Sequence, residues 1–187
     1  MNLSEANSKA EIRRHILNAR ASQLAGYVCD DAHDENLVLW LADHGVRKLA
    51  CYIAKADEPC TDLLLDVCAE VGIEVVVPRV VGNELEWCRF DWDDLNEGAF
   101  GIPEPIGPAL PLDVEAMVIP AVAIAQDGTR LGRGKGFYDR ALAKLKPGVP
   151  IIALVHDAEV LESLPRESHD QKVQWVSTCS ALLEVEN

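Results

Sequence analysis

The sequence predicts an α/β fold: a single domain, residues 1–187, with a mostly parallel central sheet flanked by helices on both faces. Two observations lead to this expectation. Short runs rich in β-branched residues alternate along the chain with stretches whose apolar residues recur at helical spacing. Several of the short runs are apolar throughout, as is typical of strands covered on both faces. No internal repeat or interdomain linker interrupts the alternation.

Helices are expected where apolar residues recur at helical spacing. The first covers residues 4–24, where Ser8 and Glu11 resemble a capping box. Arg20 and the other basic residues of this segment are expected to lie off its apolar stripe. A glycine follows each of the next two helices, which is a common place for a helix to end. The later helices are expected at residues 34–44, 61–71, 138–145 and 158–164.

Strands are expected in the apolar runs between these helices. Residues 84–90 alternate polar and apolar side chains, as a half-exposed strand does, whereas the run at 117–124 is apolar and interrupted only by Pro120. One earlier strand runs into Pro78. Residues 98–111 are rich in Gly and Pro and are expected to form an extended loop. The expected strands are 48–54, 73–77, 84–90, 117–124, 150–155 and, as the last, 173–177.

The composition excludes several classes of protein. The longest uncharged apolar run, residues 116–125, is shorter than the ~20 residues of a membrane-spanning helix. The first residues lack the apolar core of a secretory signal, so a cytoplasmic protein is expected. The six cysteines contain no Cys-x-x-Cys pair and are expected to be reduced core residues, with a zinc site built from distant Cys and His as the alternative. A net charge of −14 disfavours nucleic acid and anionic membranes as partners. We expect a monomer, with a homodimer as the alternative.

Positive charge gathers in one segment, residues 129–146. This segment holds six of the 17 basic residues of the chain and a single acid, Asp139. Its glycines, Gly132, Gly134 and Gly136, follow a buried strand and precede a helix, which is where open α/β sheets bind ligands. Glycines at such a place let backbone N–H groups approach phosphate oxygens. The segment predicts a phosphate site, although it matches neither a Walker A loop nor a dinucleotide fingerprint. A flexible turn followed by a solvated basic helix face is the alternative.

Three further features have both a functional and a structural interpretation. Asp139, beside a phosphate site, is suited to bind Mg²⁺, and a salt bridge to Arg130 or Arg140 is equally consistent with the sequence. Lys9 and Arg13 are four residues apart and can reach one anion together, or they can form a solvated face. Asp170 lies in a polar loop, where a solvated turn residue is the ordinary alternative.

Together these segments resemble the 5-formyltetrahydrofolate cyclo-ligases, also called 5,10-methenyltetrahydrofolate synthetases, over nearly the full chain. The most specific stretch is DGTRLGRGKGFYDR at residues 127–140. Weaker motifs follow the order of the family: Lys9-x-x-x-Arg13, Glu58, Pro78-Arg79, FGIPEP at residues 100–105, and Leu164-Pro with His169-Asp170. The resemblance implies one cyclo-ligase-like domain. Two positions depart from the pattern: Lys135 stands where many members have Gly, and Glu159 replaces a common Gln.

The resemblance also implies a role for each matching residue. Contacts with ATP are implied for Lys9, Arg13, Arg130, Leu131, Gly132, Arg133, Gly134, Lys135, Gly136, Phe137 and Tyr138. An association with Mg²⁺ is implied for Asp139 and Asp170. Glu58, Phe100 and Tyr138 are implied contacts of the reduced folate. Participation in the chemistry is implied for Arg130, Lys135 and Tyr138.

The implied reaction converts 5-formyltetrahydrofolate into 5,10-methenyltetrahydrofolate. It uses ATP with Mg²⁺, passes through a phosphorylated N5-formyl intermediate, and releases ADP and phosphate. Two other functions stay open on the residues alone. One is an enzyme of the sugar-phosphate isomerase or acyl-CoA transferase type, and the other is a module that senses a phosphorylated metabolite without turnover.

Overall fold

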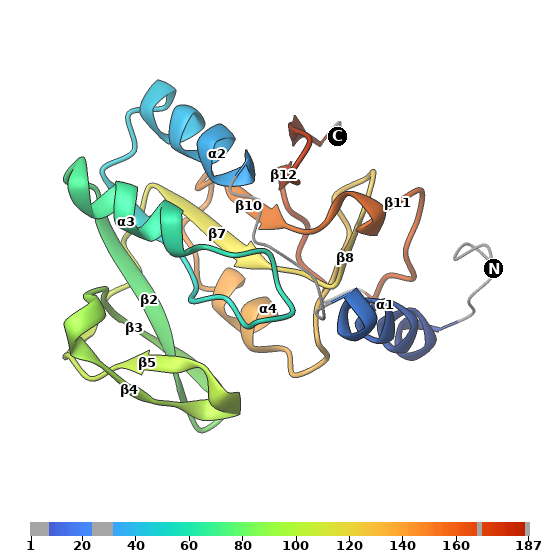
Figure 1. The fold of residues 1–187 in the computed structure, drawn as a ribbon, viewed down its shortest axis with the longest axis horizontal. Helices are drawn as coiled ribbons and strands as arrows, with labels where there is room; N and C mark the ends of the chain where they lie inside the picture. Colours follow the sequence, from blue (N-terminus) through green and yellow to red (C-terminus); the bar gives the residue numbers. More distant parts are fainter. Residues whose placement is uncertain (1–7, 24–31, 168–169, 186–187) are drawn as a thin grey trace.

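An eight-stranded sheet organises the computed structural model, which describes residues 8–23, 32–167 and 170–185 (Figure 1). The strands lie in the order β13 (Leu182–Glu184), β12 (Trp175–Ser177), β10 (Ile151–Leu154), β7 (Ala116–Pro120), β1 (Lys48–Ala50), β2 (Glu74–Val81), β3 (Glu84–Arg89) and β6 (Ala109–Leu110). The pairs from β12 through β10, β7 and β1 to β2 are parallel, and β13, β3 and β6 are antiparallel to their neighbours. The prediction of a mostly parallel central sheet is confirmed.

Helices cover both faces of this sheet, also as predicted. Alternate residues of β7 point to opposite faces, so Val118 belongs to one core cluster and Met117 to another. The first cluster contains Leu41 and Leu65, from α2 (Ala32–Asp43) and α3 (Asp62–Glu70). The second contains Leu142, from α4 (Phe137–Leu142). Two layers of apolar side chains therefore enclose the parallel strands.

A smaller three-stranded sheet carries α1 (Lys9–Gln23) beside the main sheet. Its order is β11 (Val160–Leu161), β8 (Ala123–Ala125) and β9 (Arg130–Leu131). Ile12 and Ile16 of α1 pack on Ala123 and Leu131 in a third apolar cluster. The expected capping box is met in part: the Glu11 amide donates to Ser8 Oγ, whereas the Glu11 carboxylate accepts from the Ser8 hydroxyl and not from the Ser8 amide. Residues 4–7 and 24 of the expected first helix lie outside the described residues.

Proline explains two differences from the expected strands. The apolar run at 117–124 forms two strands in different sheets, because the chain leaves β7 at Pro120 and enters β8 at Ala123. Pro78, in contrast, lies inside β2. The Phe90 amide donates to Val75 O, so these two residues form a hydrogen-bonded pair, and every second pair along the two strands is bonded in the same way. Pro78, opposite Trp87, falls in a non-bonded pair. It therefore needs no N–H donor toward β3.

Other differences arise from pairing between distant segments. The loop expected at 98–111 contains β5 (Pro103–Pro105), which pairs with β4 (Leu95–Glu97) in a hairpin, and β6 at the sheet edge (Figure 1). The helix expected at 158–164 is a 3₁₀ turn followed by β11, which pairs with β8. The strand expected at 48–54 pairs only as far as Ala50, and 173–177 is followed by the edge strand β13. Local spacing cannot reveal such partners.

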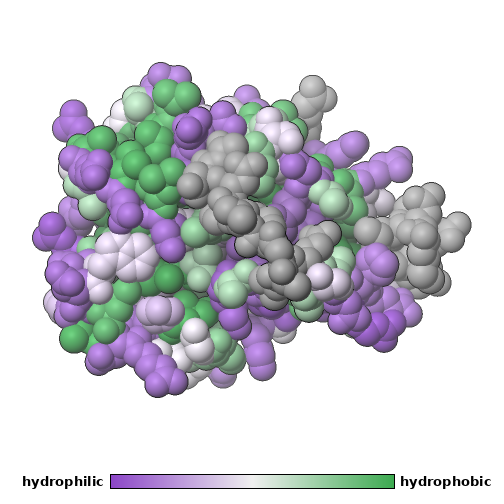
Figure 2. All heavy atoms as spheres, viewed as in Figure 1, coloured by the Kyte–Doolittle hydropathy of each residue, from purple (hydrophilic) through white to green (hydrophobic). Residues whose placement is uncertain are grey.

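The cysteines, the surface and the lengths of the helices complete the description of the fold. Cys51, Cys68 and Cys88 are buried, as expected, whereas Cys60 and Cys179 are partly exposed and Cys29 lies outside the described residues. Apolar residues gather over α2 and α3 on the face in Figure 2, among hydrophilic margins. No helix in the described ranges is both long enough and apolar enough to cross a membrane.

Arg20 corrects the expectation for α1. It is only 3% exposed and follows Ile12 and Ile16 at four-residue steps on the packed face. Its Nε and Nη2 donate to the two Glu159 carboxylate oxygens, each at 2.6 Å, and Nη2 also donates to Ala121 O. Glu159, 5% exposed, also accepts from the His156 amide. This bidentate pair ties the last turn of α1 to the segment after β10.

We expect Glu159→Ala to lower the free energy of unfolding by about 3–5 kcal/mol, because it leaves the Arg20 guanidinium buried without its carboxylate. Glu159→Gln keeps one oxygen acceptor and should cost less. Urea unfolding followed by circular dichroism measures both. Lys146→Ala, whose ion pair with Asp113 is largely exposed, is the control and should leave the midpoint unchanged. Equal midpoints for Glu159→Ala and Lys146→Ala would contradict an anchoring role for the pair.

Candidate active site

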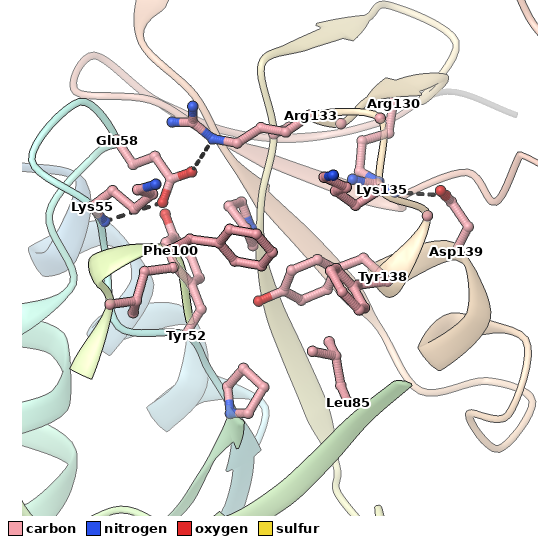
Figure 3. A pocket seen from close by; sticks show the side chains of 18 of the residues that line it. Tyr52, Lys55, Glu58, Leu85, Phe100, Arg130, Arg133, Lys135, Tyr138 and Asp139 are labelled. Carbon is pink, nitrogen blue, oxygen red and sulfur yellow. Dashed lines mark hydrogen bonds and ion pairs between the residues drawn. The ribbon is translucent and has the colours of Figure 1, made fainter. Parts of the chain in front are cut away.

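A cavity of about 270 Å³ lies between α1, the loop after β1 and the Gly-rich loop, residues 132–136 (Figure 3). The walls of this cavity include every residue that the sequence analysis assigned to a site: Lys9, Arg13, Glu58, Phe100, Asp170 and the continuous stretch from Arg130 to Asp139. The cavity is at the carboxyl edge of β1 and β7, which is where a parallel sheet is expected to bind its ligand. Segments far apart in the sequence thus form one pocket.

Part of the wall was not predicted. Tyr52 lines the cavity just beyond β1, and Pro120 lines it as the last residue of β7. Lys55 comes from the loop after β1, and Glu104 comes from β5. The only signal in the sequence for this part of the wall was the apolar run at residues 48–54, which continues past the end of β1. The positions of these side chains depend on tertiary packing.

The Gly-rich loop needs its glycines because arginine side chains pass close to its backbone. A Cβ at Gly132 would lie 2.6 Å from Arg130 Nη1, and a Cβ at Gly136 would lie 2.7 Å from Arg140 Nη1. Gly136 also has a φ of 70°, in the region that glycine adopts without steric cost. The loop can therefore curl against guanidinium groups and present its N–H groups to the cavity.

Four cations surround this loop. Arg130, 6% exposed, donates from Nη2 to Asp139 Oδ1 at 2.6 Å, and its Nε has no partner among the described residues. Arg13 Nε donates to Gly132 O at 2.7 Å, so α1 holds the loop directly. Lys9 Nζ lies 2.6 Å from Asp170 Oδ2. Lys135 lines the cavity, and no ion pair joins its ammonium group to any described residue. Such a set of cations is suited to bind a polyphosphate.

The two candidate metal ligands each accept from a cation. Asp139 is in the ion pair with Arg130, one of the two pairings that the sequence left open, and Asp170 is in the pair with Lys9. The Asp139 bond uses Oδ1, and no described residue donates to its other carboxylate oxygen. Within residues 8–23, 32–167 and 170–185, no group of three or more His, Cys, Asp or Glu side chains is placed to hold a metal ion.

Glu58 lies on the opposite wall of the cavity and is 7% exposed. Its Oε2 accepts from the Lys55 amide at 3.1 Å, and its Oε1 accepts from Arg133 Nε at 2.7 Å. Arg133 Nη2 donates to Asp57 Oδ1, also at 2.7 Å. Burial raises the pKa of Asp57, but the hydrogen bond and charge of Arg133 outweigh burial, so this pKa is below its ordinary value. The Arg133 side chain is thus directed at the loop after β1.

Two tyrosines line the cavity near Glu58. Burial raises the pKa values of Tyr138 and Tyr52 well above that of a free phenol, and the Glu58 carboxylate raises both further. A raised pKa favours the neutral phenol, which can donate a hydrogen bond. Tyr52 donates to Pro59 O. The Tyr138 hydroxyl points toward the middle of the pocket in Figure 3.

Phe100 extends over the cavity from the turn of the β4–β5 hairpin. It has φ 59° and ψ 20° and is the one non-glycine residue with positive φ in the described part of the chain. Such a conformation costs of order 1–3 kcal/mol and is commonly found at functional sites. The ring is 55% exposed, and its centroid is 6.2 Å from that of Phe137. This turn presents an aromatic surface to whatever occupies the cavity.

Two residues quoted for the resemblance act outside the cavity. Arg79 donates to Gly107 O at 2.8 Å and pairs with Glu86, so it joins β2 to the segment that follows the β4–β5 hairpin. Glu159, the position that departs from the family pattern, is bound to Arg20. Neither side chain lines the cavity. Their contacts position the Phe100 turn and α1, respectively.

The fold and the sequence were compared with those of known proteins. The sequence model of the 5-formyltetrahydrofolate cyclo-ligase family matches residues 5–179. A 5-formyltetrahydrofolate cyclo-ligase of Mycolicibacterium smegmatis is 33% identical over 184 residues, covering 91% of this chain and 93% of that protein. The corresponding protein of Haemophilus influenzae is 37% identical over 172 residues, covering 87% and 90%.

Solved structures agree with this match. The structure of a 5,10-methenyltetrahydrofolate synthetase from Aquifex aeolicus superposes with a TM-score of 0.82 at 29% identity, covering 96% of this chain and 93% of that one. A synthetase from Mycoplasma pneumoniae shares the fold, with a TM-score of 0.72, 22% identity, and coverage of 90% and 97%. Since the family model spans most of the sequence and two relatives align over most of their length, the chain belongs to the 5-formyltetrahydrofolate cyclo-ligase family.

Proposed function

We propose that this protein converts 5-formyltetrahydrofolate into 5,10-methenyltetrahydrofolate and that it consumes ATP in doing so. The observation that carries the proposal is the single cavity lined both by the residues implied for the nucleotide and by those implied for the folate. The relatives described above bear the name of this activity. Family membership favours this function over a sugar-phosphate isomerase, an acyl-CoA transferase or a metabolite sensor.

The cationic wall would bind the triphosphate. Phosphoryl transfer is accelerated mainly by positioning and by neutralising charge on the transferred group. Arg130, held in place by Asp139, and the ammonium group of Lys135 supply that charge beside the N–H groups of the Gly-rich loop. Lys9 and Arg13 bring two more cations from α1. The buried setting of Arg130 strengthens its interaction with an anion.

The opposite wall would orient the folate. The Glu58 carboxylate can accept from N–H donors of the pterin, and ionised acceptors form the stronger hydrogen bonds. Phe100 offers an apolar surface to the ring system, and the neutral phenol of Tyr138 donates a hydrogen bond. Tyr138 lies between the two walls in Figure 3, close to where folate and phosphate would meet.

With both substrates bound, the formyl oxygen on N5 attacks the γ-phosphorus of ATP, and the bond to ADP breaks. N10 then attacks the formyl carbon, the carbon–oxygen bond breaks, and phosphate leaves. N10 loses its proton, and the ring is closed as the methenyl cation. The chain contributes orientation and charge to both steps, and no general base is assigned.

Mg²⁺ would be held by the ATP phosphates and Asp139, whose second oxygen is not occupied by any described donor. The phosphates would provide most of the ligands, since Mg²⁺ is commonly bound by one or two carboxylates together with substrate phosphates and water. Asp170, paired with Lys9, is the second candidate ligand. When bound, the ion supplies charge neutralisation to the phosphates.

The first test is the near-ultraviolet absorbance of the conjugated methenyl product. Absorbance should rise when 5-formyltetrahydrofolate, ATP, Mg²⁺ and protein are mixed, and omission of any one should abolish the rise. Lys135→Ala should lower kcat by ~10²–10³, because it removes a charge that stabilises the transferred group. Lys144→Ala, whose ion pair with Glu84 lies outside the cavity, is the matched control. A folded wild-type protein that produces no rise would refute the proposal.

A second test concerns the folate wall. Phe100→Ala should raise the KM for 5-formyltetrahydrofolate ~2–10-fold, as expected for the loss of an aromatic contact worth ~0.5–1.5 kcal/mol. The KM for ATP should not change. Ile106→Ala removes an exposed apolar side chain near the same hairpin and serves as the control. Initial-rate kinetics decide the point, and an increase in the KM for ATP instead would place Phe100 on the nucleotide side.

A third test separates the two roles open to Asp139. If Asp139 binds Mg²⁺, Asp139→Asn should increase the Mg²⁺ concentration needed for half-maximal activity, measured at saturating ATP. If Asp139 serves only to hold Arg130, the variant should instead raise the KM for ATP and leave the Mg²⁺ requirement unchanged. Asp113→Asn, an exposed carboxylate outside the cavity, is the control.

A further inference from the structure

The Arg133 side chain joins the two walls of the cavity. Its Nε and Nη2 atoms donate to Glu58 Oε1 and Asp57 Oδ1, both at 2.7 Å, and we call these three residues the clasp. Arg133 belongs to the Gly-rich loop, whereas both carboxylates belong to the loop after β1. In Figure 3 the Arg133 side chain extends toward Glu58, and a dashed line marks the bond between them. The resemblance implies a contact between Arg133 and ATP, but these hydrogen bonds direct its side chain toward the folate wall.

The charges of the clasp depend on one another. Glu58 is nearly fully buried and follows Asp57 directly in the chain, so two carboxylates occupy one small volume. A buried carboxylate without a cationic partner is strongly disfavoured and tends to take up a proton. Arg133 supplies that partner. Burial lowers the pKa of Arg133, but its bonds to Asp57 and Glu58 outweigh burial and raise it overall. Arg133 therefore gives the buried Glu58 carboxylate a cationic partner at 2.7 Å on the wall assigned to the folate.

The clasp leaves room for a ligand on Glu58. Each carboxylate oxygen can accept about two hydrogen bonds. Oε1 uses one for Arg133, and Oε2 uses one for the Lys55 amide. A pterin can therefore donate to Glu58 while the clasp stays closed. Release of Arg133 is not required for folate to bind.

The backbone of Arg133 is part of the phosphate-binding loop. Its neighbour Gly132 accepts a hydrogen bond from Arg13, and its neighbour Gly134 has a φ of 92°. Phosphate oxygens bound to the N–H groups of this loop would hold the backbone in one conformation. The Arg133 side chain, and through it Glu58, would be held with it. When the first ligand has ordered the loop and the Glu58 side chain, the second ligand does not bear that entropic cost again. The two ligands therefore bind cooperatively.

We infer that Arg133 is a positioning residue which, through the clasp, couples nucleotide binding to folate binding. The inference rests on the proposed function. It predicts that a bound nucleotide increases the affinity for folate and, because linkage is reciprocal, that folate increases the affinity for the nucleotide by the same factor. The increase is expected to be about fivefold or more, within the usual range of such couplings.

Isothermal titration calorimetry tests this inference. The Kd of 5-formyltetrahydrofolate is measured with and without a non-hydrolysable ATP analogue and Mg²⁺. The ratio of the two Kd values should be about 5 or more in the wild type and close to 1 in Arg133→Gln. The Kd of the analogue alone should not differ between these two proteins. Lys144→Gln, from the same basic segment but outside the cavity, should keep the wild-type ratio.

Asp57→Asn is the second variant and removes one arm of the clasp while Glu58 keeps its bond to Arg133. The ratio of the two Kd values in this variant should lie between those of the wild type and Arg133→Gln. If circular dichroism shows that Arg133→Gln is unfolded, Asp57→Asn decides the question. A wild-type ratio in either folded variant would overturn the inference. Weaker binding of the analogue alone to Arg133→Gln would also overturn it, because Arg133 would then be a phosphate contact. A wild-type protein that binds no folate would refute the proposed function itself, and the inference with it.

Discussion

The parallel pairing of β2, β1, β7 and β10 brings the carboxyl ends of β1 and β7 to the edge of the sheet where the cavity lies. Parallel strands end at the same edge of a sheet, so the chain segments after β1, β7 and β10 must emerge side by side. Glu58 follows β1, Pro120 ends β7, and Glu159 follows β10. The Gly-rich loop comes later, after β9 of the three-stranded sheet, and α1 holds it through the bond from Arg13 to Gly132. The strand order therefore places one side of the cavity, and α1 and the three-stranded sheet complete it.

Paired charges then fix the parts of the cavity relative to one another. Arg20 binds Glu159 and Arg130 binds Asp139, so each of these two buried cations has a carboxylate beside it, and the more exposed Arg133 binds Glu58. These pairs join α1, the Gly-rich loop and the loop after β1. A chain with a net charge of −14 has carboxylates in excess, and its clustered cations would be neutralised if all of them were paired in this way. Lys135 keeps its charge for a ligand because no described carboxylate forms an ion pair with it.

The central parallel strands and the cationic Gly-rich segment of the cavity could be predicted from the sequence, because both have local signals. Apolar runs mark β7 and β10, and the segment 127–140 carries its glycines and cations in one continuous stretch. The remaining features depend on partners far away in the chain. Arg20 is charged, and only the packing of α1 on Glu159 shows why it is buried. The separation of β7 from β8 at Pro120 and the pairing of β11 with β8 likewise follow from contacts that spacing along one segment does not contain.

The same short stretch serves both walls of the cavity, and this has a consequence for the chemistry. Arg130 and Lys135 belong to the cationic wall, Arg133 reaches Glu58 on the opposite wall, and Tyr138 lies between the two walls. A reaction in which one substrate attacks the other requires the two reacting atoms to be held close together in a fixed orientation. When one segment contributes to both binding walls, a shift of that segment moves the groups on both sides together. The relative position of the two substrates then depends on the internal geometry of residues 130–139 more than on the packing of distant parts of the fold.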